Sequence, residues 1–161
     1  TGPMISQESI RLTRDVTAGS AFQALSTLGA ELLLATLPDY LAGHLTPQPQ
    51  PGEGVTYAPM LKKEDGRLDF TRSAAELERR VRAMNPWPGA WFEWNASPLK
   101  VMRASVGDAG QRAASGTRLI VEGRPAVMCA DTALVLEEVQ PAGKKVMPGK
   151  SFLAGARSWA M

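Results

Sequence analysis

The sequence has 161 residues, 44% of them hydrophobic, which is enough for one domain or for one small domain with an appendage. Its single cysteine, Cys129, excludes a disulfide framework within the chain and favours a reducing, cytoplasmic setting. The net charge of +2 is unevenly placed, because residues 1–61 hold two arginines against five acids and residues 62–161 hold sixteen basic residues against eleven acids. Such an asymmetry favours contact between the later part and a polyanion.

The first part of the chain predicts an extended segment followed by a helix. Residues 4–12 alternate loosely and predict a strand or an extended segment. Thr17 is a suitable N-cap for a helix whose apolar residues recur from Ala18 to Leu41. Gly29 and Pro38 are expected to bend or divide this helix. The longest apolar run lies around residues 32–34 and is too short for a membrane span, so no membrane partner is expected.

A proline-rich segment separates this helix from the rest of the chain. Residues 44–54 hold three prolines and two glycines with little to bury, which indicates an extended linker. We therefore divide the chain into a first part (1–43), a linker (44–61) and a second domain (62–161).

The second domain begins with a helix and continues in short strands. Ser73 and Glu76 match a capping box, and the helix should stop at Asn85 because a proline follows it. Alternating patterns separated by turn residues predict strands at 90–94, 99–106, 117–121, 126–129 and 133–139, with a last helix over 148–156. The predicted class is α+β, mainly β: a small, closed or nearly closed β-barrel after a helix.

Enzyme motifs are missing from the sequence. It has no phosphate-binding glycine loop and no dinucleotide fingerprint. Its only histidine, His44, heads the linker, where a solvated role is expected and a metal site is not. We therefore assign no catalytic, cofactor-binding or metal-ligating residue to this chain.

Basic residues give the positive signal, because neutralising phosphates supplies sequence-independent affinity for nucleic acids. The arginines of the helix after Ser73 are expected to be an ordinary solvated face. Trp87 could stack on a base, but a packing wedge at the corner between helix and strand is the favoured interpretation, and the same holds for Trp91, Phe92 and Trp94. The candidate nucleic-acid-binding residues are Lys62, Lys63, Lys100, Arg103, Lys144, Lys145 and Lys150.

Seven stretches occur in an order that resembles the methionyl-tRNA formyltransferase family over nearly the whole chain. They are TGPM (1–4), LGAEL (28–32), VTYA (55–58), KEDGRLDF (63–70), SAAELER (73–79), NPWPGA (85–90) and QPAGKK (140–145).

The resemblance implies the C-terminal part of a two-domain enzyme. In that family a Rossmann-like N-terminal domain transfers a formyl group from 10-formyltetrahydrofolate to the methionine of initiator methionyl-tRNA, and an OB-like barrel helps to hold the tRNA. The catalytic Asn, His and Asp would all precede Thr1, so residues 1–43 would be a residual strand and helices of the catalytic domain. The chain alone is then expected to be inactive, to bind no cofactor, to be a monomer and to begin at a cut end.

Two alternatives stay open. The chain could belong to another formyltransferase that acts on an amino-sugar nucleotide or on folate itself, in which case the second domain need not be basic. It could also be a structural or protein-binding barrel with no enzymatic role, whose affinity for tRNA would be no better than that of any mildly basic protein.

Overall fold

The computed structural model describes residues 2–160, so Thr1 of the first quoted stretch lies outside the described residues. The chain divides into two compact units, unit 1 (Thr1–Met60) and unit 2 (Leu61–Met161). Each unit is described by itself below.

Unit 1 consists of one long helix and two extended segments. Helix α1 runs over Ala18–Leu41 and begins at the predicted cap, where Ser20 N donates to Thr17 Oγ1 over 3.2 Å and Thr17 N donates to Ser20 Oγ over 3.0 Å. The predicted division at Gly29 and Pro38 is wrong, because α1 is continuous through both. Pro38 removes only one helical hydrogen bond close to the C-terminal end, and an isolated glycine costs only about 1 kcal/mol.

Of the two structures predicted for residues 4–12, the extended segment is present and the strand is not. This segment has a single bridge, in which Met4 and Gln48 exchange backbone hydrogen bonds of 2.7 and 2.8 Å. An extended segment needs a paired neighbour along its length to become a strand, and among the described residues it meets the linker at one point only.

Helix α1 buries none of its residues. By length and composition alone, α1 could cross a membrane. From the sequence no such span is expected, because its longest apolar run is short. The core helix of a soluble protein and a signal sequence have the same length and composition. The absence of a membrane partner stays a prediction.

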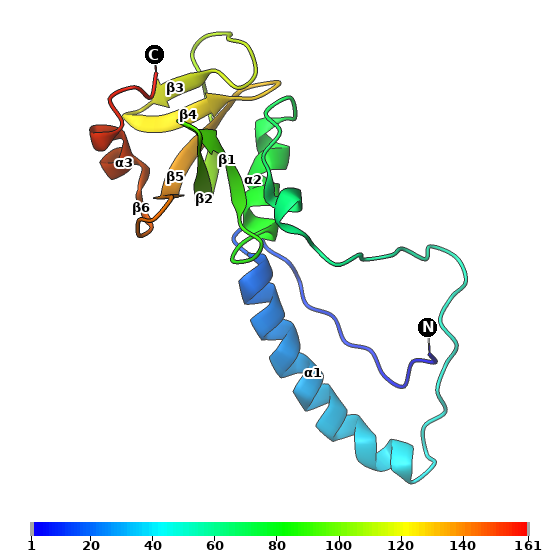
Figure 1. The fold of residues 1–161 in the computed structure, drawn as a ribbon. Coiled ribbons are helices and arrows are strands. Elements are labelled where there is room, and N and C mark those ends of the chain that lie inside the picture. Colours follow the sequence, from blue (N-terminus) through cyan, green and yellow to red (C-terminus); the bar gives the residue numbers. More distant parts are fainter. Residues whose placement is uncertain (1, 161) are drawn as a thin grey trace. The chain divides into compact units, whose positions relative to one another are not determined.

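Unit 2 holds all the strands (Figure 1). A 3₁₀ turn, η1 (Lys63–Gly66), precedes α2 (Ala74–Ala83), and α3 (Gly149–Gly155) lies near the C-terminus. The strands are β1 (Ala90–Trp94), β2 (Ser97–Gly107), β3 (Arg118–Val121), β4 (Arg124–Met128), β5 (Ala133–Pro141) and β6 (Met147–Pro148). All five predicted strands and both predicted helices of this part are therefore present, and the predicted α+β, mainly β class is confirmed.

The strands form one antiparallel sheet in the order β1-β2-β5-β4-β3, with β6 paired to β5. Strands β1 and β3 stand at the ends of this order, so the ladders among the described residues leave the sheet open between them. Helix α2 packs on β2 and β5, and α3 packs on β4, β5 and β6 (Figure 1). β5 is thus the central strand, with neighbours on both edges.

The core of unit 2 lies on both faces of the sheet. Successive residues of β5 from Ala133 to Leu136 are all buried, which requires cover on each face. The larger cluster includes Trp159, which is 1% exposed, contacts Phe92 and Phe152 edge-on and donates its indole N–H to the Leu119 carbonyl over 2.8 Å. A C-terminal aromatic residue therefore ties the sheet to α3.

The start of α2 differs in one detail from the predicted capping box. Glu76 N donates to Ser73 Oγ over 3.3 Å as expected, but the Glu76 carboxylate pairs with Arg72 instead of reaching back to Ser73. Asp131 satisfies a different donor of the first turn, because its Oδ1 accepts from the backbone N–H of Ala74 over 2.8 Å. The β4–β5 turn thus caps α2.

Candidate nucleic-acid interface

Lysines and arginines behave differently in unit 2. All six lysines of the sequence lie between residues 62 and 150, and all six are exposed. Within residues 2–160, no lysine ammonium lies within 4.0 Å of a carboxylate, whereas five arginines of unit 2 form ion pairs. The lysine charges are therefore available to an outside partner.

Five of the lysines lie along one end of the sheet. Trp91 of β1 stands opposite Lys100 of β2, which in turn stands opposite Gln140 of β5. Directly opposed residues share a face of the sheet, and the buried neighbours Leu99 and Val101 point to the other face. The row Trp91, Lys100, Gln140 therefore runs across the outer face of three strands.

The first end of this row anchors the η1 segment. Trp91 Nε1 donates to the Lys63 carbonyl over 3.1 Å, and Leu68 N donates to the Trp91 carbonyl over 2.8 Å. Lys62 N is held by Asp65 Oδ2 at 2.7 Å. Gly66 packs so closely on Gly89 that a Cβ at Gly66 would collide with the Gly89 carbonyl oxygen. These contacts fix Lys62 and Lys63 beside β1.

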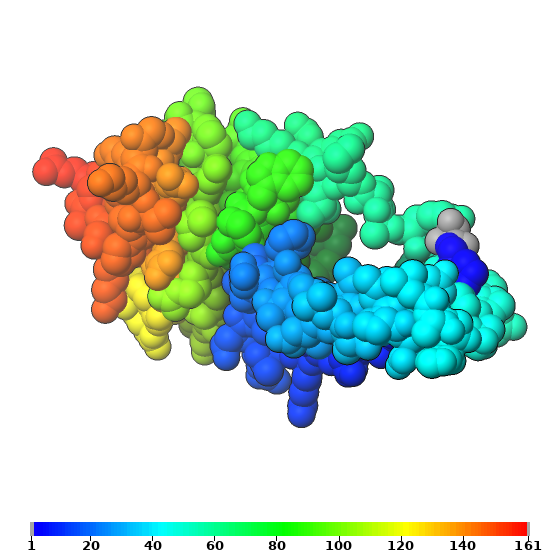
Figure 2. Space-filling view, turned by 90° about the horizontal axis from the view of Figure 1, so that it is seen from below, coloured from blue at the N-terminus to red at the C-terminus, as the bar shows by residue number. Residues whose placement is uncertain are grey.

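The other end of the row anchors the β5–β6 turn. Gln140 Nε2 donates to the Lys144 carbonyl over 3.0 Å, and Lys144 N donates to the Pro141 carbonyl over 3.0 Å. Gly143 adopts φ 71°, a conformation that favours glycine, so the turn is tight. In Figure 2 the orange segment that contains this turn borders the green segment of β2. We call Lys62, Lys63, Lys100, Lys144 and Lys145 the lysine row.

Arg67 joins the lysine row, although the sequence argument does not single it out. Its guanidinium carbon lies 6.0 Å from the centroid of the Trp91 ring, the outer limit of a cation–π contact. Its ion pair with Glu93 is long, at 3.9 Å, and both side chains are exposed. The pairing of residue 67 with β1 is a tertiary feature that no sequence pattern announces.

Arg103 and Lys150 lie apart from the lysine row. Both line an open hollow of about 510 Å³ together with Arg124, Glu122 and Glu137. Arg103 pairs with Glu138 at 3.3 Å, and Arg124 pairs with Glu137 at 2.7 Å. Acids therefore balance most of the basic charge there.

Glu137 is ionised in this hollow. Burial raises the pKa of its carboxyl, but hydrogen bonds from Ser105 Oγ, at 2.6 Å, and from Arg124 outweigh burial and lower the pKa overall. The carboxylate holds both side chains in place. A group already engaged in this way is suited to structure and poorly suited to proton transfer.

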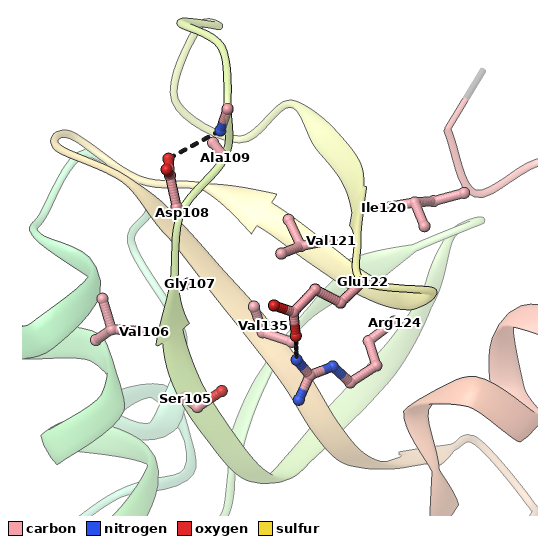
Figure 3. A pocket seen from close by; sticks show the side chains of 11 residues that line it. Ser105, Val106, Gly107, Asp108, Ala109, Ile120, Val121, Glu122, Arg124 and Val135 are labelled. Carbon is pink, nitrogen blue, oxygen red and sulfur yellow. Dashed lines mark hydrogen bonds and ion pairs between the residues drawn. The ribbon is translucent and has the colours of Figure 1, made fainter.

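A neighbouring hollow of about 420 Å³ lies between the end of β2 and the β3–β4 turn (Figure 3). Asp108 Oδ1 accepts from the Gly110 backbone N–H over 2.9 Å, and Glu122 pairs with Arg124. Each acid thus serves a loop or an ion pair. Within residues 2–160, no three His, Cys, Asp or Glu side chains gather in an arrangement that could hold a metal ion.

The remaining residues that the sequence singles out fall into three environments. The thiol of Cys129 is buried, which raises its pKa to about 11. His44 is exposed and lies 3.4 Å from Asp39. The helix arginines are engaged locally, since Arg82 pairs with Glu78 at 2.7 Å and Arg80 donates to the Asp65 carbonyl.

The aromatic residues between α2 and the end of β1 differ in burial, which the sequence does not indicate. Phe92 is buried, and the Trp94 ring lies 4.9 Å from Phe152, so both act as the predicted packing wedge. The same prediction is wrong for Trp87, which is 60% exposed. It lies in the α2–β1 loop, where the neighbouring proline and glycine occupy the buried positions.

The fold and the lysine row define a small basic α+β domain built on an antiparallel sheet. The chain belongs to the family described as formyl transferase, C-terminal domain, which matches residues 60–157. It is 44% identical over 157 residues to a methionyl-tRNA formyltransferase of Myxococcus xanthus, covering 96% of this chain and 49% of the relative. It is 39% identical over 159 residues to that of Chloroflexus aurantiacus, covering 98% of this chain and 51% of the relative. The chain thus spans about half the length of the curated relatives it matches.

Solved structures agree on the fold. HypX from Aquifex aeolicus superposes with a TM-score of 0.68 at 16% identity, covering 98% of this chain and 29% of HypX. WlaRD, a sugar 3N-formyl transferase, superposes with a TM-score of 0.62 at 13% identity, covering 90% of this chain and 51% of WlaRD. At such low identity these likenesses concern the fold alone.

Proposed function

We propose that this chain is the C-terminal, tRNA-binding part of an enzyme that formylates initiator methionyl-tRNA. The whole enzyme would transfer the formyl group of 10-formyltetrahydrofolate to the amino group of methionine. The names of the relatives and the identity of 38–44% support the reaction class. The lysine row, five exposed ammonium groups without carboxylate partners, carries the proposal of RNA binding by an OB-like domain.

The proposed division of labour leaves the chemistry outside this chain. Formyl transfer to an amine needs a base for the amine proton and a donor for the developing oxyanion. The acids of unit 2 named above are tied to ion pairs, caps or loops, which suits a binding role. Residues 1–43 would then belong to the catalytic domain, 44–61 would be the linker, and the enzyme would act as a cytoplasmic monomer. We expect the purified chain to form no formyl-methionyl-tRNA from 10-formyltetrahydrofolate, and detectable product would refute this.

The lysine row can be tested by the salt dependence of tRNA binding. Each phosphate contact contributes roughly 0.9 to the slope of log K against log salt concentration. Lys144→Ala combined with Lys145→Ala should lower the slope by about one to two units, and Lys100→Ala by about one. Arg112→Ala is the matched control, because Arg112 is also exposed, forms no ion pair in the described chain and lies in the β2–β3 loop, outside the row.

If Lys100→Ala and Arg112→Ala gave the same salt slope for tRNA binding, the position of a basic residue on the sheet would not affect that binding. The lysine row would then have no specific role. Arg103 and Lys150 are also proposed to contact tRNA, but the case for them is weaker because acidic side chains lie beside them. Their substitution is expected to change the slope less than that of Lys100.

A formyltransferase with another acceptor is the second candidate. The superposition with a sugar 3N-formyl transferase favours it as far as the fold goes. Titration of initiator and elongator tRNA at two salt concentrations separates the candidates. A tRNA enzyme should show a steep, salt-dependent affinity that the lysine variants weaken. A sugar enzyme, or a purely structural domain, should bind both RNAs weakly and alike.

A further inference from the structure

Trp87 is the only exposed one of the four tryptophans, all of which lie in the described part of unit 2. Tryptophan buries more apolar area than any other residue when it joins a core, and Trp159, only 1% exposed, does so here. Trp87 is 60% exposed although its chain neighbours Pro88 and Gly89 are buried. The loop therefore turns its backbone inward and its indole ring outward.

Several contacts fix the loop that presents this indole ring. Asn85 Nδ2 donates to the Met102 carbonyl of β2 over 3.0 Å, and Gly89 N donates to the Met84 carbonyl over 2.8 Å. Pro86 and Pro88 flank Trp87 and restrict its backbone. A ligand that contacts the ring would thus pay little to order the loop.

The loop also adjoins the lysine row. A Cβ placed on Gly89 would lie 3.8 Å from Cδ of Lys100, so the aliphatic stem of that lysine passes over the loop two residues after Trp87. On its other side Gly89 contacts Gly66 of the segment that carries Lys62 and Lys63. The loop that carries the exposed indole ring thus contacts Lys100 and the segment that carries two further lysines of the row.

An exposed aromatic ring beside a cationic track is the arrangement with which proteins hold unpaired nucleotides, because the cations take the phosphates and the ring takes a base. A protein partner would instead need acidic groups that match the same lysines. We propose that Trp87 stacks on an unpaired base of the RNA whose phosphates the lysine row binds. This inference rests on the proposed RNA-binding function and names the base contact within it.

The test compares a single-stranded oligouridylate with an RNA duplex of the same length, using the full 161-residue chain. Trp87→Ala should weaken binding of the oligouridylate about tenfold, since stacking on one base is worth roughly that much or more. Binding of the duplex and the salt slope should be unchanged, because no phosphate contact is lost. Trp87→Phe should keep most of the affinity. Ile120→Ala, an exposed apolar residue on β3 at the opposite end of the sheet order, is the matched control and should bind as the unchanged chain does.

Fluorescence gives a second measurement that does not depend on the alanine variant being folded. Oligouridylate should quench part of the tryptophan emission of the unchanged chain and protect that part from acrylamide, and Trp87→Phe should abolish both effects. Equal losses of oligouridylate and duplex binding, or unchanged quenching in Trp87→Phe, would overturn stacking. If Trp87→Ala binds like the unchanged chain while the lysine variants lower the salt slope, stacking fails and phosphate binding stands. If the lysine variants also leave the slope unchanged, the proposed function fails as well.

Discussion

The two units of this chain bury their apolar residues to very different extents. Helix α1 of unit 1 has 24 residues and buries none, and Leu34 is 74% exposed. Helix α2 of unit 2 has ten residues and buries Ala74, Leu77 and Val81 against the sheet. Both helices begin at a hydroxyl N-cap, so local signals start a helix in either setting. The difference shows that capping and periodicity define a helix, whereas a sheet beside it defines a domain.

The largest expected effect tests whether stability resides in unit 2. Trp159→Ala should lower the free energy of unfolding by about 3–5 kcal/mol, because it leaves a cavity among Phe92, Trp94 and Phe152. Leu34→Ala in α1 should change it by less than about 0.5 kcal/mol. Urea unfolding followed by far-UV circular dichroism measures both. A loss as large for Leu34→Ala would mean that unit 1 has a core of its own.

Two glycine substitutions, one in each unit, are expected to have smaller and opposite effects on stability. A Cβ at Gly149 would overlap the Leu136 carbonyl oxygen and lie 3.0 Å from Pro125, so Gly149→Ala should destabilise the chain by about 1–3 kcal/mol. A Cβ at Gly29 in α1 would meet nothing within 4 Å, so Gly29→Ala should favour the helix by up to about 1 kcal/mol. The two urea midpoints should therefore move in opposite directions. A shift of both in the same direction would contradict the contrast in packing.

The smallest effect concerns the cap that Asp131 provides to α2. Hydrogen bonds from the backbone N–H groups of Ala74 and Thr132 lower the pKa of Asp131. The folded state therefore favours the carboxylate, and this stabilisation is present above about pH 4 and is lost as the pH falls through the lowered pKa.

Asp131→Asn should accordingly melt a few degrees below the unchanged chain at pH 7, and the gap should close at a pH well below 4. Asp39→Asn in exposed unit 1 is the matched control and should melt with the unchanged chain at both pH values. A gap that is constant with pH would show that the charge of Asp131 does not contribute.

The sequence predicts the elements of unit 2 well because alternation and turn residues are local. Strand β1 has the predicted bounds, and the predicted start of α2 at Ser73 is confirmed. Strand β6 is missing from the prediction because two residues carry no alternation. The strand order is missing too, because the partners of β5 are distant in the sequence.

The candidate site is less predictable than the strands, because its residues are brought together by contacts between distant parts of the sequence. The sequence alone singles out every lysine, but it cannot separate Lys100 in its exposed row from Arg103, which pairs with Glu138 across the β2–β5 ladder. The register shift between Val101 and Ala104 decides which charges face each other, and it arises from tertiary pairing. Likewise, nothing local separates the exposed Trp87 from the packed Trp94.

The pairing of β2 with β5 has a consequence for synthesis. Leu99 pairs with Pro141 and Gly107 with Ala133, so this ladder joins segments that β3 and β4 separate in the chain. Contacts between distant segments form late, because a long loop must close before they stabilise anything. A polypeptide still emerging from the ribosome would carry Lys62, Lys63 and Lys100 before it could display them together. The ordered surface would then arise only after β5 and the β5–β6 turn have been made.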